Sequence, residues 1–236
     1  SDIQLLLSNS NTNSYIELIN NNAIISNLAV NEIASANLSF SVSTDCPYGY
    51  NFSLVLSMIS EESSWESSYS FNVESLIESF ESQSFDTFLW EFSGDADWTI
   101  EGNEFIGGSL SARSGTIDHN MTSEILINMD IVEDGQIMFD KKVSCEDVGS
   151  QTGTYYDYLA FYIDGVEQAK WAGEINWSQN SFNVSSGEHT FLWKYNKDSG
   201  VTSGSDAVWI DNIIFPPSYY SSMMLGDVNE DGNINI

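Results

Sequence analysis

Hydrophobic residues alternate with polar ones along much of the chain, and helical periodicity is nearly absent. The alternation is clearest at residues 38–42, 52–58, 65–73, 125–131 and 191–195. A period of two places successive side chains on opposite faces, so these segments predict strands with one buried face. The dipeptides at 134–135, 164–165 and 186–187 (Asp-Gly, Asp-Gly and Ser-Gly) are typical of the turns that join antiparallel strands. The pattern therefore predicts an all-β protein.

Changes in composition divide the predicted strands into three parts. Residues 1–73 predict an N-terminally incomplete Ig-like β-sandwich, because a complete one needs about 100 residues. Residues 74–217, which begin at an acidic, Ser-rich segment, predict a two-sheet antiparallel jelly roll. The pair Pro216-Pro217 cannot continue a central strand, so 218–236 are predicted to be a linker and a calcium-type loop.

Charge and hydropathy together exclude two classes of partner. The chain has 6 Lys+Arg and 35 Asp+Glu, a formal net charge of −29. Nucleic acids attract basic surfaces, so nucleic-acid binding is not expected. No apolar run approaches the roughly 20 residues that span a bilayer, so membrane insertion is not expected either. The strongly negative electrostatic field of the protein favours bound cations. The alternative is that the acidic residues only keep a secreted protein soluble.

Residues that usually carry catalysis are scarce. The only histidines, His119 and His189, lack zinc-ligand spacing, and no G-x-S-x-G motif is present. Cys46 and Cys145 are predicted to be buried thiols rather than a disulfide, and acidic neighbours would raise the pKa of the Cys145 thiol. Residues 174–177 faintly resemble a laminarinase-type glycosidase strand but lack its second carboxylate, so we interpret them as a surface turn. The chain is predicted to be non-catalytic.

Asp211 interrupts the apolar segment 207–215, and alternation places it on the same face as Ile213 and Phe215. An unpaired buried carboxylate is strongly unfavourable, so a cation, a basic side chain or backbone N–H groups must compensate it. Since basic residues are so few, we predict Ca²⁺, which prefers oxygen ligands. Glu81 is the expected second carboxylate, with Glu78 in reserve, because the first and last strands of a jelly roll are neighbours. A solvated Asp211 at a sheet edge is the alternative.

Five motifs in order carry a resemblance to a known kind of module: ESFESQSFDTFLWEFSGDADWTI, GGSLSARSG, DYLAFYIDG, SSGEHTFLWKYNKD and GSDAVWIDNIIF. Residues 74–217 resemble the MAM-like and cleaved-adhesin jelly rolls that follow gingipain-type cysteine peptidases and other exported bacterial enzymes. The resemblance implies a structural Ca²⁺ held by Glu81, Asp211 and a backbone carbonyl near Gly108. The run STDCPYGYNFSLVLSMIS is similar to the Ig-like domains that precede such jelly rolls.

The last residues, GDVNEDGNINI, resemble the first loop of a dockerin, an EF-hand-type calcium loop with Gly at its sixth position. The residues at its ligand positions are Asp227, Asn229, Asp231, Asn233 and Asn235. Its twelfth position would lie beyond Ile236, so we expect the chain to be a slice of a longer protein. A complete loop would imply a cohesin-like partner, whereas an acidic terminal turn is the alternative.

These features together predict a non-catalytic, calcium-stabilised binding or adhesion region of a larger secreted or cell-surface bacterial protein, by analogy a peptidase. Its expected partners are an extracellular glycan or protein, or neighbouring copies of itself. Sugar rings would stack on Trp171, Trp177, Tyr155 and Tyr156, although packing within the sandwich is the commoner role of such residues. The alternatives are a structural subunit or spacer of an extracellular filament or surface layer, and a carbohydrate-binding module.

Overall fold

The computed structural model describes residues 2–9 and 15–219, and within them it contains strands and turns but no helix. The prediction of an all-β protein is confirmed. Contacts divide the chain into two units, 1–75 and 76–236, and each unit has its own hydrophobic core. No helical segment of the described residues has the length and hydrophobicity of a bilayer span.

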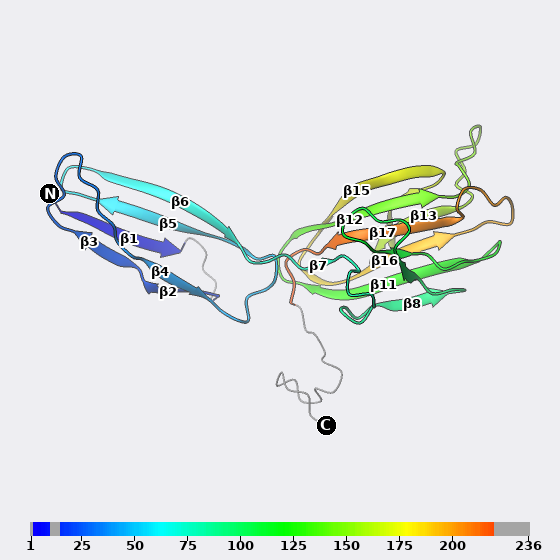
Figure 1. The fold of residues 1–236 in the computed structure, drawn as a ribbon, viewed down its shortest axis with the longest axis horizontal. Helices are drawn as coiled ribbons and strands as arrows, with labels where there is room; N and C mark the ends of the chain where they lie inside the picture. Colours follow the sequence, from blue (N-terminus) through cyan, green and yellow to red (C-terminus); the bar gives the residue numbers. More distant parts are fainter. Residues whose placement is uncertain (1, 10–14, 220–236) are drawn as a thin grey trace, which may run out of the picture. The chain divides into compact units, whose positions relative to one another are not determined.

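The first unit contains two antiparallel sheets (Figure 1). Its strands are β1 (Ile3–Asn9), β2 (Ile16–Asn20), β3 (Asn22–Ile25), β4 (Ser39–Val42), β5 (Asn51–Ile59) and β6 (Ser64–Asn72). One sheet has the order β3-β1-β5-β6, and the other pairs β2 with β4. Tyr50, Phe52 and Leu54, each less than 5% exposed, form the centre of its core.

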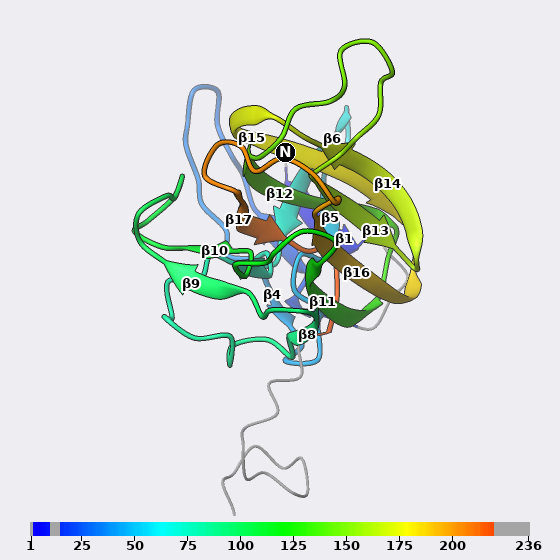
Figure 2. The ribbon, with the colours of Figure 1, turned by 90° about the vertical axis from the view of Figure 1, so that its right-hand side faces the viewer.

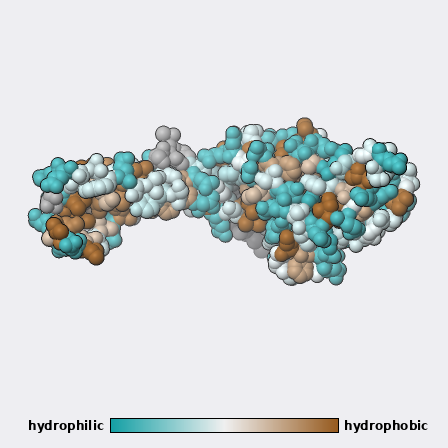
Figure 3. Space-filling view, turned by 90° about the horizontal axis from the view of Figure 1, so that it is seen from above, coloured by the Kyte–Doolittle hydropathy of each residue, from teal (hydrophilic) through white to brown (hydrophobic). Residues whose placement is uncertain are grey.

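Strand β6 departs from the prediction that its aromatic face is buried. Trp65 is 53% exposed, Tyr69 50% and Phe71 37%, although all three share one face of the strand. The reason is that β6 is an edge strand, while the opposing sheet contains only two strands. Phe71 still stacks on Phe52, with ring centroids 5.2 Å apart. On the face shown in Figure 3, brown hydrophobic residues are visible on this unit among hydrophilic ones.

The second unit is a sandwich of two antiparallel sheets, as expected for a jelly roll (Figures 1 and 2). Its strands are β7 (Ile77–Glu78), β8 (Glu91–Gly94), β9 (Thr99–Glu101), β10 (Ser111–Arg113), β11 (Thr122–Ile131), β12 (Gly135–Ser144), β13 (Tyr158–Ile163), β14 (Val166–Trp171), β15 (Glu174–Val184), β16 (Gly187–Asn196) and β17 (Ala207–Ile214). One sheet has the order β15-β12-β17-β10-β9, with β7 also paired to β17, and the other has the order β14-β13-β16-β11-β8.

Aromatic side chains fill the space between these two sheets. Phe139 from one sheet contacts Phe161 and Trp193 from the other, with ring centroids 4.9 and 5.3 Å away. All three side chains are fully buried. Trp90 and Trp98 are also buried. Rings of this size bury the largest apolar areas available to a sandwich core, so they hold the two sheets together.

Several local predictions can be checked directly. The turn at 164–165 joins the paired antiparallel strands β13 and β14. The turns at 134–135 and 186–187 instead cross from one sheet to the other, between β11 and β12 and between β15 and β16. Cys46 and Cys145 are buried, one in each unit.

Two predictions were wrong. Residues 174–177 begin strand β15 instead of forming a surface turn, because they pair with the end of β12. Ser218 is buried and bridges to Ile131, so it belongs to the sandwich and not to a linker.

Strand β17 contains an irregularity that changes which side chains face the core. The pairing register between β17 and β12 shifts, and Asn212 has a φ of 48°, in the left-handed region. Ile210 and Ile213 therefore both lie in the core, although strict alternation places residues three apart on opposite faces. The prediction that Asp211 shares a face with Ile213 and Phe215 was wrong for this reason.

Candidate functional site

Glu81 follows the short strand β7 and binds the loop that joins β9 to β10 in the same sheet. Its Oε1 accepts hydrogen bonds from the backbone N–H groups of Ser109 (2.7 Å) and Leu110 (2.8 Å), and Oε2 accepts one from Ser109 Oγ (2.8 Å). Hydrogen bonds from the Ser109 amide and hydroxyl and from the Leu110 amide lower the pKa of Glu81. The carboxylate is therefore ionised and already committed to residues 109–110.

Asp211 binds the same loop from β17. It is fully buried, and its Oδ2 accepts hydrogen bonds from the backbone N–H groups of Ile106 (3.1 Å) and Gly107 (3.3 Å). Oδ1 accepts a third from Asn212 N–H (2.7 Å). Burial raises the pKa of Asp211, although these three N–H groups oppose the shift. Backbone N–H groups, one of the three possibilities considered from the sequence, thus compensate the buried aspartate.

Gly108 lies in the same loop, beside the carboxylate of Glu81. Its φ is +64°, and a Cβ added there would lie 2.3 Å from Glu81 Oε1. Only glycine permits both features without strain. The structure thus brings Glu81, Asp211 and Gly108 together around residues 104–110, as the resemblance implied. Glu78, the reserve ligand, is buried and instead accepts hydrogen bonds from Phe80 N–H and Trp90 Nε1.

The donor set at this first site fits calcium in kind, since carboxylate oxygens are ligands that Ca²⁺ prefers. Each of the four oxygens of Glu81 and Asp211 already accepts at least one hydrogen bond. Oε2 of Glu81 and Oδ1 of Asp211 accept one each and so retain a lone pair.

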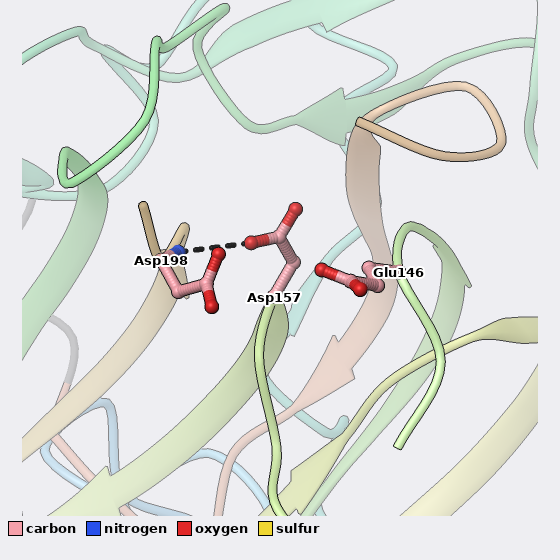
Figure 4. Close-up of side chains that lie close together, drawn as sticks. All are labelled: Glu146, Asp157 and Asp198. Atoms are coloured by element: carbon pink, nitrogen blue, oxygen red, sulfur yellow. Dashed lines mark hydrogen bonds between the residues drawn. The ribbon is translucent and has the colours of Figure 1, made fainter. Parts of the chain in front are cut away.

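A second group of carboxylates lies between the loops that follow β12 and β16 (Figure 4). Glu146, Asp157 and Asp198 each offer an oxygen, and these oxygens lie within 4.8 Å of one another. The backbone N–H of Asp198 donates to Asp157 Oδ1 (2.9 Å), while Asp157 Oδ2 is buried and has no hydrogen-bond partner. We call these three residues the acidic cluster.

Sequence reasoning missed the acidic cluster. Glu146 was considered only for its effect on Cys145, and the three residues are spread over about fifty positions between 146 and 198. A signal was nevertheless present, because Asp198 follows the predicted strand at 191–195 and Asp157 is the first residue of the motif DYLAFYIDG, directly before β13. Only the strand order, which places β13 beside β16, reveals that these positions are neighbours.

A constellation of Ser185, His189 and Asp164 resembles a catalytic triad in composition. His189 Nδ1 lies 2.7 Å from Asp164 Oδ2, and Nε2 lies 3.4 Å from Ser185 Oγ. However, Nε2 is closer, at 2.9 Å, to the backbone carbonyl oxygen of Ser185. A nitrogen that faces an acceptor must carry a proton, so Nε2 has no lone pair with which to activate the serine. Burial raises the pKa of Asp164, but hydrogen bonds from Thr190 and His189 lower it by more, so that the pKa is lowered overall. The group is a structural network.

Cys145 is equally unsuited to nucleophilic chemistry. The pKa of its thiol is raised to about 12, chiefly by burial. A hydrogen bond from the Gly173 backbone opposes this increase, and the negative charge of Asp157 adds to it. Its Sγ donates to the backbone carbonyl of Asp157 (3.4 Å). The thiolate needed for attack is therefore not formed near neutral pH.

The four aromatic residues predicted to stack on sugars are all only partly exposed. Trp171 packs against the core and lies under the ammonium of Lys141, 4.8 Å from its ring centroid. Tyr155 also packs against the core, beneath Lys170. Trp177 lies within β15, and its Nε1 is buried without a hydrogen-bond partner. Tyr156 precedes β13. The one exposed tryptophan of the described residues, Trp65, belongs to the first unit and not to this set.

The predicted calcium loop, with Asp227, Asn229, Asp231, Asn233 and Asn235, lies outside the described residues. Its ligand role stays a prediction.

Comparisons with known proteins were made for the whole chain. No family model matches it, and the search of curated proteins gave no match. Among solved structures, the secreted serine protease VesC from Vibrio cholerae has a TM-score of 0.44 and 14% identity, over 94% of this chain and 45% of VesC. A cleaved adhesin domain of Lys-gingipain from Porphyromonas gingivalis has a TM-score of 0.44 and 12% identity, over 61% of this chain and 99% of that domain. TmCBM61 in complex with β-1,4-galactotriose has a TM-score of 0.42 and 14% identity, over 58% and 94% of the two chains.

The chain spans less than half the length of VesC. At these identities and TM-scores, none of the three structures transfers an activity or a ligand to this chain.

Proposed function

We propose that this chain is a non-catalytic, calcium-stabilised binding region of a larger secreted or cell-surface protein. One observation carries the proposal: two carboxylates that are far apart in the sequence of the second unit, those of Glu81 and Asp211, bind the same loop. Such a site stabilises a surface loop without creating a reactive group. The strongly acidic composition and the two unreactive constellations, around His189 and Cys145, support a binding role over a catalytic one.

Calcium dependence gives the first test. We expect the melting temperature to rise by several degrees between EDTA and millimolar Ca²⁺, since a ligand that binds only the native state stabilises it by mass action. The Asp211→Asn variant should lose part of this rise, because the substitution removes a charge that would hold the ion. Differential scanning calorimetry of the wild type and of Asp130→Asn, an exposed control, measures the effect. Identical melting curves with and without Ca²⁺ would contradict the proposal.

Glycans are one class of partner, proposed because aromatic side chains suit sugar rings. Trp177→Ala tests the aromatic residue predicted from the sequence, and Trp65→Ala tests the most exposed tryptophan of the structure. We expect a glycan array to show binding that one of these substitutions weakens at least tenfold. If the wild type binds no glycan on the array, a protein partner remains as the proposed ligand.

Assembly is a second candidate function, and strand β6 is the specific observation in its favour. This edge strand carries three exposed aromatic residues, and unpaired edges accept further strands from neighbouring chains. Analytical ultracentrifugation across a concentration series, with and without Ca²⁺, would reveal a polymer. A monomer at all concentrations would exclude self-assembly of this segment.

A further inference from the structure

The acidic cluster differs from the first site in how its buried charge is compensated. Asp211 accepts three backbone N–H bonds. Asp157 is equally buried, with 0% of its surface exposed, yet only its Oδ1 accepts a hydrogen bond. Its Oδ2 has no donor within hydrogen-bonding distance. A buried carboxylate oxygen without a partner is costly, and in a native protein it points to a missing ligand.

One basic side chain lies near, but it is already engaged. The ammonium of Lys197 donates hydrogen bonds to Asp206 and to Thr202 Oγ1 (3.2 Å), and it lies 3.8 Å from Asp157 Oδ2. At that last distance Lys197 and Asp157 form an ion pair, but no hydrogen bond reaches Oδ2. The other five basic residues, Arg113, Lys141, Lys142, Lys170 and Lys194, are engaged elsewhere in the second unit. The described residues therefore place four carboxylates, those of Glu146, Asp157, Asp198 and Asp206, against the ammonium of Lys197, with His119 near Glu146.

The remaining oxygens of the acidic cluster are available for coordination. Asp198 Oδ1 accepts a hydrogen bond from Gly200 N–H (2.6 Å), and its second oxygen has no donor among residues 2–9 and 15–219. The carboxylate of Glu146 accepts no hydrogen bond from any described residue. Figure 4 shows the Asp157 side chain between the other two, with all three pointing toward one another. Burial and the charges of Asp198 and Asp157 raise the pKa of Glu146, which reflects the cost of holding these charges together.

From this geometry we propose that Glu146, Asp157 and Asp198 bind a divalent cation of the Ca²⁺ class. All three ligands are oxygens, and their separation of at most 4.8 Å fits within the roughly 5 Å diameter of a Ca²⁺ coordination shell. The ion would replace the missing partner of Asp157 Oδ2 and neutralise the neighbouring charges. This site is distinct from the one at Glu81 and Asp211 and does not depend on it.

Binding at the acidic cluster would join three loops at one end of the second unit. The segment 145–157 supplies two ligands, and the segment 197–206, at the same end in Figure 1, supplies the third. The backbone carbonyl of Asp198 also accepts a hydrogen bond from Asn120 N–H (2.8 Å), which ties in the loop before β11. The expected consequence of ion binding is slower exchange of backbone amides in these loops.

Calcium titration by calorimetry on the 236-residue chain tests the proposal. We expect Glu146→Gln and Asp157→Asn each to weaken one calcium-binding event at least tenfold, whereas Asp130→Asn, an exposed acid outside the cluster, leaves every event unchanged. Glu146→Gln breaks no hydrogen bond of the described protein, so it remains informative if Asp157→Asn does not fold. Asp211→Asn should alter only a different binding event, so the two sites can fail separately.

Hydrogen exchange then locates the ion. Calcium should slow exchange in residues 145–157 and 197–206 of the wild type and of Asp211→Asn, but not of Glu146→Gln. The proposal is overturned if the wild type binds no calcium at millimolar concentration, or if Glu146→Gln and the control bind and exchange alike.

Discussion

Gly108 determines how closely Glu81 approaches the loop that it binds. Its positive φ and the missing Cβ are both required, because any side chain would collide with the carboxylate oxygen. Gly153 provides a natural comparison, since its φ is +67° and a Cβ there would meet nothing within 4 Å. The two positions share the backbone conformation and differ only in the contact.

We expect Gly108→Ala to destabilise the protein by about 2–4 kcal/mol and Gly153→Ala by about 1–2 kcal/mol, the usual cost of the left-handed conformation for a residue with a Cβ. The difference measures the collision with Glu81. Urea denaturation of both variants gives the free energies of unfolding. Equal losses would mean that Glu81 moves away without cost.

Two strands illustrate how an element's place in its sheet changes the meaning of its sequence. In β5 and β6 the alternation is equally regular, and Phe52 pairs directly with Phe71. Strand β5 lies inside its sheet, so its Phe52 is buried, whereas β6 lies at the edge and exposes Trp65. Alternation predicts which residues share a face, but the neighbouring elements decide whether that face is covered.

The energetic consequence can be measured within the first unit. Phe52→Ala should cost about 3–5 kcal/mol, the usual range for deleting a buried aromatic ring. Trp65→Ala should cost less than about 1 kcal/mol, because half of its surface is already in water. Urea denaturation of dilute protein supplies both values. A loss at Trp65 close to that at Phe52 would show that β6 is covered in solution.

At the scale of the whole molecule, the excess of acids makes stability depend on pH in a particular direction. Burial raises the pKa values of Glu78, Asp157 and Asp211, so the folded state holds protons that the unfolded chain has released. Wherever the folded state binds more protons, stability falls as pH rises. This window begins at about pH 4, the ordinary pKa of these groups.

We therefore expect the melting temperature in EDTA to increase as pH falls from 7 toward 5, and to decrease below about pH 4, where Glu81 and Asp164, whose pKa values are lowered, lose their contribution. Saturating Ca²⁺ should flatten the increase, since bound carboxylates no longer gain protons. The same scan in 0.5 M NaCl separates these local effects from general repulsion, which salt screens. A melting temperature that falls steadily from pH 7 to 5 would contradict the expectation.

Much of the fold could be predicted from alternation and turn dipeptides, because strand formation is local. The site was predicted less completely. Glu81, Asp211 and Gly108 do meet, but the bulge at Asn212 reverses the faces of β17, and backbone N–H groups bind Asp211. Neither feature leaves a trace in the pattern of hydrophobic residues.

By itself, the sequence determined the all-β class, the positions of the turns at 134–135, 164–165 and 186–187 and the excess negative charge, since each depends on residue type and short-range periodicity. Only the tertiary structure decided which charges share a buried site. Asp157 and Asp198 are 41 residues apart in the chain, and they meet because strands β13 and β16 pair side by side. Electrostatic energy depends on separation and burial in space, and neither quantity is present in the order of residues along the chain.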